Sequence, residues 1–242
     1  MKVLVISDIH ANLNALDAVL DKVGLVDAVW CLGDLVGYGP DPNECIDRVK
    51  SLPQLKCVIG NHDAAALRRI DAESFNPEAK NALLWTQKAL SESSLRFLAG
   101  LPETIEIGAV TLTHGSPRQP VWEYLLDAHT AALNFQYFYT PFCFVGHTHL
   151  PVIYQQNNPN HTTSINIPRA GTSIPLVPRL IINPGSVGQP RDRDPRASFA
   201  IFDTDNQTWD FQRVTYDISS VQHRMKKAGL PERHIVRLDG GW

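Results

Sequence analysis

The chain has 242 residues, of which 43% are hydrophobic and 19% are charged, and its formal net charge is −3. These totals allow one large core or two small domains, and the lack of a net positive charge argues against a nucleic-acid polymer or an anionic membrane as partner. No apolar run is long enough to cross a bilayer. The N-terminal residues MKVLVISDIH are typical of a first β-strand rather than a secretory signal, so we expect a cytoplasmic protein.

The first hundred residues alternate between predicted strands and predicted helices. Continuous apolar runs indicate strands that are buried on both faces, at 2–7, 27–33 and 55–60. Apolar residues at helical spacing indicate helices between them, at 12–24, at 41–50 and within 63–100. Because no linker divides the chain, this alternation favours one α/β domain over 1–242.

The remaining residues are richer in predicted strands. A hairpin is expected over 104–115 and a helical stretch over about 127–138. Further strands are expected at FCFVG, PVIYQQ, RLIINPGS, ASFAIFDT and TWDFQRVTYD, followed by a last helix at ISSVQHRMKKAG. Residues 157–178 contain four prolines and no clear period, so we expect an irregular loop or flap with at most one short strand. Residues from about 230 to 242 are expected to form a C-terminal tail.

Polar side chains follow five of the predicted strands, at the point where each strand ends. They are Asp8 and His10 after the first strand, Asp34 after the second, Asn61, His62 and Asp63 after the third, His114 after the hairpin, and His147 and His149 after FCFVG. Alone, the motifs at 8–10, 33–34 and 61–63 are more typical of a cap or a turn, His114 alone indicates nothing, and GHTH alone is moderately specific. Because ligand sites form at the carboxyl ends of strands in α/β sheets, their shared position predicts one common site.

The residue types in these motifs indicate a transition-metal site. Imidazole nitrogens mixed with carboxylate and amide oxygens favour Zn, Mn, Fe, Co or Ni over Ca or Mg. The candidate ligands are too many for one tetrahedral ion and suit two; they are Asp8, His10, Asp34, Asn61, His114, His147 and His149. Paired cations clamp both oxygens of an in-line displacement at phosphorus. The sequence therefore predicts a phosphoester hydrolase.

The ordered series D-x-H, G-D, G-N-H-D, H-G and G-H-T-H resembles the calcineurin-like metallophosphoesterase superfamily. The stretches DIHANLNAL, GDLVGYGPDP and NPGSVGQPRD resemble its compact bacterial and archaeal phosphodiesterase-type branch, and the resemblance covers about residues 1–216. It implies a four-layer α/β/β/α sandwich, in which two mixed β-sheets are flanked by helices and the metals lie at the edge of the sheets.

The resemblance also implies a role for each residue of the series. Its metal ligands would be Asp8, His10 and His149 for the first ion, Asn61, His114 and His147 for the second, and Asp34 bridging both. His62 matches the catalytic histidine of the family, and Asp63 would orient it. A metal-bridging hydroxide would attack phosphorus in line, and His62 would protonate the leaving oxygen or stabilise its charge. We expect two divalent transition-metal ions, with Mn²⁺ ahead of Fe, Zn, Ni and Co.

One departure from the superfamily narrows the substrate class. Its protein Ser/Thr phosphatases carry G-D-x-x-D-R-G, whereas the motif here is GDLVGYG, which has no arginine. We therefore expect a small phosphodiester or a nucleotide as substrate, with Asn12, Tyr38 and Arg191 as candidate substrate-binding residues. A phosphomonoester or a dinucleoside polyphosphate is the alternative substrate.

Two functions of other classes are disfavoured. A non-catalytic scaffold resembling the retromer subunit of this fold would lack the catalytic histidine, whereas His62 and every ligand position are present. An amidohydrolase would show a different histidine pattern. The histidines outside the series are expected to be ordinary surface or partly buried residues; they are His129, His161, His223 and His234. Four aromatic residues are expected to serve packing, with a substrate pocket as the alternative; they are Trp85, Phe97, Trp122 and Tyr124.

Overall fold

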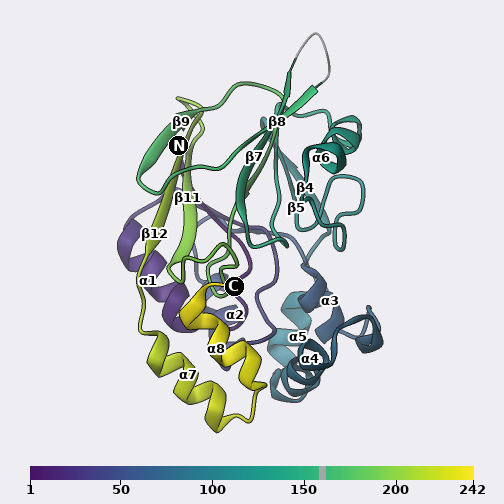
Figure 1. The fold of residues 1–242 in the computed structure, drawn as a ribbon, viewed down its shortest axis with the longest axis vertical. Coiled ribbons are helices and arrows are strands. Elements are labelled where there is room, and N and C mark those ends of the chain that lie inside the picture. The colour runs from purple at the N-terminus through teal and green to yellow at the C-terminus, as the bar shows by residue number, and fades with distance from the viewer. Residues whose placement is uncertain (158–161) are drawn as a thin grey trace.

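The structure is a computed structural model that describes residues 1–157 and 162–242. Two six-stranded sheets pack face to face, and helices lie on their outer sides. Figure 1 shows α1 (Leu13–Val23) outside one sheet and α6 (Ala128–Asn134) outside the other. The four-layer α/β/β/α arrangement implied by the resemblance is therefore confirmed.

The first sheet contains the three parallel strands that were expected at the start of the chain. Its order is β3 (Lys56–Cys57), β2 (Ala28–Cys31), β1 (Lys2–Ile6), β11 (Ala197–Asp203), β12 (Thr208–Val214) and β9 (Thr172–Pro175). β1 pairs in parallel with β2, and β2 pairs in parallel with β3, whereas β11, β12 and β9 are joined antiparallel. The carboxyl ends of β1, β2 and β3 consequently open on one edge.

The second sheet repeats this mixed design. Its order is β4 (Thr104–Ile107), β5 (Val110–Thr113), β6 (Phe142–Phe144), β10 (Leu180–Pro184), β7 (Pro151–Asn157) and β8 (Thr162–Asn166). β5, β6 and β10 run parallel to one another, and the β4–β5 hairpin forms over the predicted residues.

Aromatic side chains fill the layer between the two sheets. Phe144 of β6 lies with its ring centroid 4.8 Å from that of Trp209 and 5.3 Å from that of Phe202. Trp30 of β2 packs against the same pair of phenylalanines. These rings are at most 2% exposed, and truncating one such ring to alanine typically costs about 3–5 kcal/mol of stability. The layer holds the two groups of parallel strand ends in fixed relation.

The other helices cover the first sheet and one end of the molecule. Those from the first hundred residues are α2 (Pro42–Lys50), α3 (Asn61–Ala66), α4 (Pro77–Ala89) and α5 (Glu92–Ala99), with a short 3₁₀ turn at Ala72–Ser74. The C-terminal ones are α7 (Ile218–Lys227) and α8 (Glu232–Gly240), which pack on one another. Among the described residues, none of the helices combines the length and the apolar character that crossing a membrane requires.

Two sequence expectations are corrected by these elements. Residues 157–178 were expected to be an irregular loop or flap with at most one strand, but their described part contains β8 and β9; residues 158–161 lie outside the described residues. β7 starts directly after His149 and runs away from it, and Pro175 of β9 lies level with the amino end of β1. The opposite ends of the strands β8 and β9 lie nearer the carboxyl strand ends, because Thr172 of β9 is level with Val5 of β1 and Asn166 of β8 pairs with Ile153 of β7. The expected tail at 230–242 is wrong because α8 occupies most of it.

Candidate metal centre

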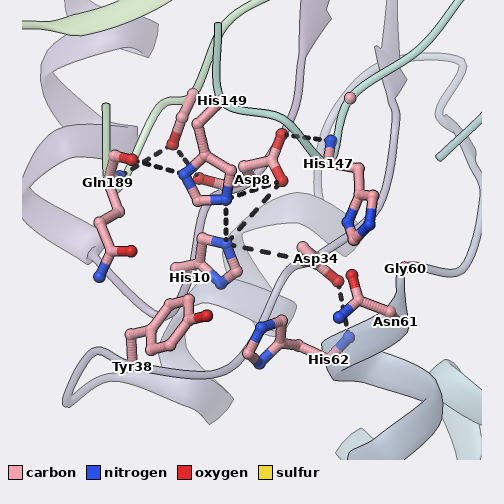
Figure 2. A network of polar contacts seen from close by, with 12 residues as sticks. Asp8, His10, Asp34, Tyr38, Gly60, Asn61, His62, His147, His149 and Gln189 are labelled. Atoms are coloured by element: carbon pink, nitrogen blue, oxygen red, sulfur yellow. Dashed lines mark hydrogen bonds and ion pairs between the residues drawn. The ribbon is translucent and has the colours of Figure 1, made fainter. Parts of the chain in front are cut away.

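The side chains predicted as metal ligands lie together where the parallel strands of both sheets end. Figure 2 shows Asp8 after β1, Asp34 after β2 and Asn61 at the start of α3, facing His147 from the second sheet. Each of the seven candidate side chains is at most 3% exposed. Their nitrogen and oxygen atoms fall into groups whose members lie within 4.8 Å of one another: Asp8, His10 and His149; His10, Asp34 and His62; and Asp34, His114 and His147.

The backbone at these residues adopts a conformation that non-glycine residues seldom take. Asp8, His10, Asp34, His147 and His149 all have positive φ, between 49° and 66°. This left-handed region costs an ordinary residue free energy, and such strain concentrates at functional sites. Backbone hydrogen bonds between the loop after β1 and the loop after β2 hold this conformation. They run from Asp8 N to the Gly33 carbonyl (3.0 Å) and from His10 N to the Asp34 carbonyl (2.9 Å).

Two glycines permit close approach within the centre. A Cβ on Gly60 would lie 2.1 Å from Asp34 Oδ1, and one on Gly146 would lie 2.0 Å from the hydroxyl oxygen of Ser7. Neither residue has a positive φ. Glycine is therefore required at both positions by space rather than by backbone conformation.

Four imidazole rings are held in one defined tautomer by backbone carbonyls. The contacts are His10 Nδ1 to Val36 O (3.0 Å), His114 Nδ1 to Leu32 O (2.7 Å), His149 Nδ1 to Gln189 O (2.5 Å) and His147 Nε2 to Trp122 O (3.1 Å). A carbonyl only accepts, so each of these nitrogens carries a proton. In the neutral ring the other nitrogen then has a lone pair, and metal-binding histidines are usually oriented by such contacts.

The remaining donor atoms converge in a way that fits cations. His10 Nε2 lies 3.1 Å from His149 Nε2, so two lone pairs face each other. Asp8 Oδ1 is buried and has no hydrogen-bond partner of good geometry, and it lies 3.4 Å from His149 Nε2. Buried lone pairs that face one another are stabilised by a shared positive charge. This donor set therefore fits divalent transition metals.

Asp34 lies between the two groups of histidines. Its Oδ2 is 3.6 Å from His10 Nε2 and 3.3 Å from His114 Nε2. Its Oδ1 accepts a hydrogen bond of 2.8 Å from the backbone N–H of His62. The same Nε2 atom of His114 also lies 3.0 Å from Asn61 Oδ1. One carboxylate is thus shared by both groups.

Burial and mutual charge shift the pKa values of these residues in opposite directions. Burial lowers the pKa of His147 to about 3 and that of His62 to about 4. Burial also opposes protonation of His114, but the neighbouring Asp34 carboxylate outweighs it and raises the pKa of His114 to about 9. Burial raises the pKa of Asp8 to about 7, against the positive charge of His114. Without metal, the centre therefore holds protons near neutral pH.

The ring of His62 points into the same space from the first turn of α3 (Figure 2). Its centroid lies 5.0 Å from that of His10 and 4.4 Å from that of Tyr38. Its Nδ1 has no hydrogen-bond partner among the described residues, and a Cβ on Gly37 would approach that atom to 2.6 Å. The imidazole is therefore enclosed by neighbouring rings and by Gly37, and its buried Nδ1 is left without a partner in the described part of the chain.

Asp63 does not make the expected contact with His62. Its Oδ1 accepts from the backbone N–H of Val36 and its Oδ2 accepts from that of Gly60, both at 3.1 Å. The carboxylate thus joins the loop after β2 to the loop before α3. Asp63 fixes the backbone around His62 rather than the ring itself, which corrects the sequence expectation.

The candidate substrate-binding residues divide into two kinds. Asn12 accepts from Ala15 N with Oδ1 and donates to the Gly188 carbonyl with Nδ2, so its side chain caps α1 and is committed to structure. Tyr38 is packed against His10, with 4.6 Å between the ring centroids. Arg191 Nη2 lies 3.4 Å from Tyr38 Oη. The structure therefore brings Tyr38 and Arg191 to the centre and gives Asn12 a capping role.

His234 of α8 was expected to be an ordinary surface or partly buried residue, and this is wrong. It is 2% exposed, and its ring centroid lies 4.5 Å from that of Tyr38. The signal was present in the sequence, since His234, Ile235 and Leu238 form the buried face of an amphipathic helix. His161, in the same group of histidines, lies outside the described residues.

Other residues at the centre were not among the site residues expected from the sequence, although Asn183 begins the stretch NPGSVGQPRD. Asn183 of β10 donates from Nδ2 to the Gly146 carbonyl (2.6 Å) and so supports the GHTH turn. Tyr124 stacks on His147 with 3.8 Å between centroids and is 45% exposed, which places it at the rim of the centre. Of the other aromatic candidates, Trp85 and Phe97 pack against hydrophobic clusters.

Comparison with known proteins identifies the family to which the fold belongs. The model of the calcineurin-like phosphoesterase superfamily domain matches residues 1–207. The crystal structure of a metallophosphoesterase from Sphaerobacter thermophilus is 48% identical, with a TM-score of 0.92, covering 100% of this chain and 99% of that chain. Protein MJ0912 of Methanocaldococcus jannaschii is 37% identical over 237 residues, 95% of this chain and 94% of the relative.

A shorter similarity concerns a nucleotide hydrolase. Over 67 residues, 26% of this chain and 24% of the relative, the sequence is 42% identical to the symmetrical bis(5'-nucleosyl)-tetraphosphatase of Proteus mirabilis. The family match, by contrast, spans all the candidate metal ligands from Asp8 to His149. The expected family and the expected class of enzyme are thereby confirmed: the chain belongs to the calcineurin-like phosphoesterase superfamily and is a metal-dependent phosphoesterase.

Proposed function

We propose that the chain hydrolyses small phosphodiesters or nucleotides with a pair of divalent cations bound in one centre. The observation that carries this proposal is the position of Asp34, whose Oδ2 lies within 3.6 Å of His10 Nε2 and 3.3 Å of His114 Nε2. A carboxylate between two histidine groups is the arrangement that serves two ions rather than one.

Two sets of residues would hold the cations. They are Asp8, His10 and His149 for the first, Asn61, His114 and His147 for the second, and Asp34 for both. When bound, cations of this kind supply Lewis-acid charge to phosphoryl oxygens and lower the pKa of a water that attacks phosphorus in line. The carboxylate and amide oxygens suit Mn²⁺, whereas the imidazole nitrogens suit Fe, Zn and Ni. We propose Mn²⁺ as the first choice ahead of Fe, Zn, Ni and Co.

The chain's own residues would then act on the substrate. His62 has a free Nδ1 and a pKa lowered to about 4 by burial. At neutral pH without metal its imidazole is therefore neutral and carries one N–H. We assign it the leaving oxygen, to which the N–H of the neutral ring would donate a hydrogen bond as negative charge develops there; transfer of a proton would require the imidazolium form. Its backbone N–H holds Asp34, so ring and ligand keep a fixed relation.

Two observations support the substrate class. The GDLVGYG motif lacks the arginine of the protein phosphatases of the superfamily. The rim residue Tyr124 offers an aromatic face that is 45% exposed, on which a base or an aryl group can stack. The partial similarity to a bis(5'-nucleosyl)-tetraphosphatase keeps dinucleoside polyphosphates as the alternative substrate.

The test compares a diester with a monoester. We expect the purified chain with added Mn²⁺ to release p-nitrophenol from bis(p-nitrophenyl) phosphate faster than from p-nitrophenyl phosphate, and to lose both activities in a chelator. Faster release from the monoester would establish the phosphomonoesterase alternative. No metal-dependent release from either compound would contradict the proposal. A nucleotide panel that includes diadenosine tetraphosphate then ranks the natural substrate classes.

A further inference from the structure

Two arginines from distant parts of the chain meet beside Tyr38. Arg191 Nη2 donates to Gln189 Oε1 at 3.1 Å, and Arg237 Nη1 lies 3.4 Å from the same oxygen. Arg191 comes from the loop after β10, whereas Arg237 belongs to α8. The two elements are joined directly, because Arg193 N donates to the Gly241 carbonyl at 2.6 Å. Figure 1 shows α8 reaching the middle of the molecule at the C-terminus.

The positive charge of this pair is not balanced locally. Among the described residues, no carboxylate oxygen lies within 4.0 Å of either guanidinium, whereas Arg213, Arg224 and Arg233 each pair with an acid. Burial, and next the charge of Arg191, lower the pKa of Arg237. Two neighbouring half-buried guanidinium groups that share only a neutral acceptor, Gln189 Oε1, create a positive potential that favours binding of an anion.

Several buried donors at this place have no partner. Arg191 Nε, Arg237 Nε and Gln189 Nε2 are all buried without a hydrogen bond among the described residues. Neither ring nitrogen of His234 makes a well-formed hydrogen bond; the backbone of Glu78 lies near enough to raise its pKa but not in good geometry. Buried donors are nearly always paired in folded proteins, and three of these residues are linked through Gln189 Oε1, so their unpaired donors suggest a ligand with several acceptor oxygens.

We propose that Arg191, Arg237 and Gln189 form an anion subsite that holds a second, non-reacting phosphate of the substrate. Its position fits this role. Tyr38 separates the arginines from the catalytic end of the centre, with its ring centroid 4.4 Å from His62 and its hydroxyl oxygen 3.4 Å from Arg191 Nη2. The two places lie on either side of the Tyr38 ring, so a substrate with consecutive phosphates would have to pass around that ring to occupy both. The inference rests on the proposed function, since it presumes a phosphoester at the metals.

The subsite also lies partly outside the region shared with the family. The family model ends at residue 207, while α8 spans Glu232–Gly240. The part of the subsite contributed by α8 therefore lies beyond the residues that the family model matches. We expect the subsite to select for nucleoside di- or polyphosphates or pyrophosphate esters over simple monophosphate esters.

The experiment compares the binding of two anions to the Mn²⁺-loaded full chain by isothermal titration calorimetry at fixed free Mn²⁺. The probes are inorganic pyrophosphate, which carries a second phosphate, and inorganic phosphate, which does not. We expect the wild-type chain to prefer pyrophosphate, and Arg237→Gln and Arg191→Gln each to reduce that preference about tenfold, the loss typical of one charge-assisted hydrogen bond. The matched control is Arg233→Gln, an exposed arginine on the same helix, which should leave the preference unchanged.

The outcomes separate the alternatives. An equal loss of affinity for both anions would mean a general field of positive charge, and a loss for phosphate alone would mean a site for free phosphate; either result overturns the inference. An unchanged preference in variants that keep the wild-type thermal midpoint overturns it too. Metal-dependent hydrolysis of bis(p-nitrophenyl) phosphate is measured in parallel. Its absence in the wild type would refute the proposed function, whereas normal hydrolysis with an unchanged anion preference would refute only the subsite.

Discussion

His10 Nε2 and His149 Nε2 lie 3.1 Å apart and face each other. In each ring the Nδ1 atom carries the proton, because it donates a hydrogen bond to a backbone carbonyl. In the neutral rings both facing nitrogens therefore hold lone pairs. The chain spends conformational free energy to keep this geometry, since both residues have positive φ. Such an arrangement fits a cation that both rings would bind.

Asp34→Asn should remove metal from both positions of the centre. An amide carries no charge, and Asp34 is the side chain that lies between the two histidine groups. We expect the metal content of the variant to fall below half of the wild-type value when both are loaded identically and measured by elemental analysis. Asp21→Asn, an exposed substitution on α1, is the control. Normal loading of the Asp34 variant would rule out the shared carboxylate.

His62→Ala should separate catalysis from metal binding. Removing a group that acts on the leaving oxygen typically lowers kcat by about 10²–10⁴-fold, while the seven proposed ligands stay in place. We expect that loss in bis(p-nitrophenyl) phosphate turnover together with an unchanged metal content, and no loss in His223→Ala, which alters an exposed histidine of α7. A His62 variant with full turnover would refute the assigned role.

Metal binding should release protons at neutral pH. In the metal-free centre the Asp34 carboxylate raises the pKa of His114 to about 9, so this ring carries a second proton at pH 7 that a metal ion must displace. Burial raises the pKa of Asp8 to about 7, so its carboxyl group is partly protonated at pH 7 and contributes a fraction of a further proton. The apparent metal affinity should therefore rise as the pH rises from about 7 to 9, and the proton release should fade above 9.

Calorimetric titration of Mn²⁺ in two buffers of different ionisation enthalpy measures this release. The dependence of the observed heat on buffer enthalpy gives the number of protons, which we expect to be at least about one at pH 7. Heats that are identical in both buffers at pH 7 would show that the metal-free centre holds no displaceable proton.

Gly60→Ala should disrupt the centre because the added methyl group has no room beside Asp34. The added Cβ would lie 2.1 Å from Asp34 Oδ1, so the carboxylate or the α3 loop must move; overpacking of this kind costs about 1–3 kcal/mol. We expect a lower thermal midpoint and weaker metal binding. Gly100→Ala is the matched control, since its nearest neighbour would be 3.6 Å away. Equal behaviour of the two variants would contradict the proposed close packing around Asp34.

The strand ends were predictable from sequence for a definite reason. Runs such as KVLVIS and CFVG are buried on both faces, so they stand out as continuous apolar stretches, and whatever polar residue follows them lies at the sheet edge. This rule alone predicts that Asp8, Asn61 and His147 lie close together, and in the structure they do (Figure 2). The edge strands β8 and β9 gave no such signal, because their side chains are largely exposed.

The finer contacts of the centre depend on tertiary geometry that residue order does not encode. Asp63 follows His62 in sequence, which suggested a contact between them, yet the helical turn directs its carboxylate to Val36 and Gly60. The positive φ of His149 and the tautomers set by backbone carbonyls depend on how the loops meet. The helix α8 could have been predicted from the sequence, since its apolar residues have helical spacing, but its short length made the segment resemble a tail.

The central claim is that Asp34 joins two cations in a single pocket. Anomalous X-ray scattering at the manganese edge, from crystals of the full chain grown with Mn²⁺, tests it most directly. The account predicts two peaks roughly 3.5–4 Å apart, with the Asp34 carboxylate between them and His10 and His114 on opposite sides. A single peak, or peaks bound by residues elsewhere, would contradict it.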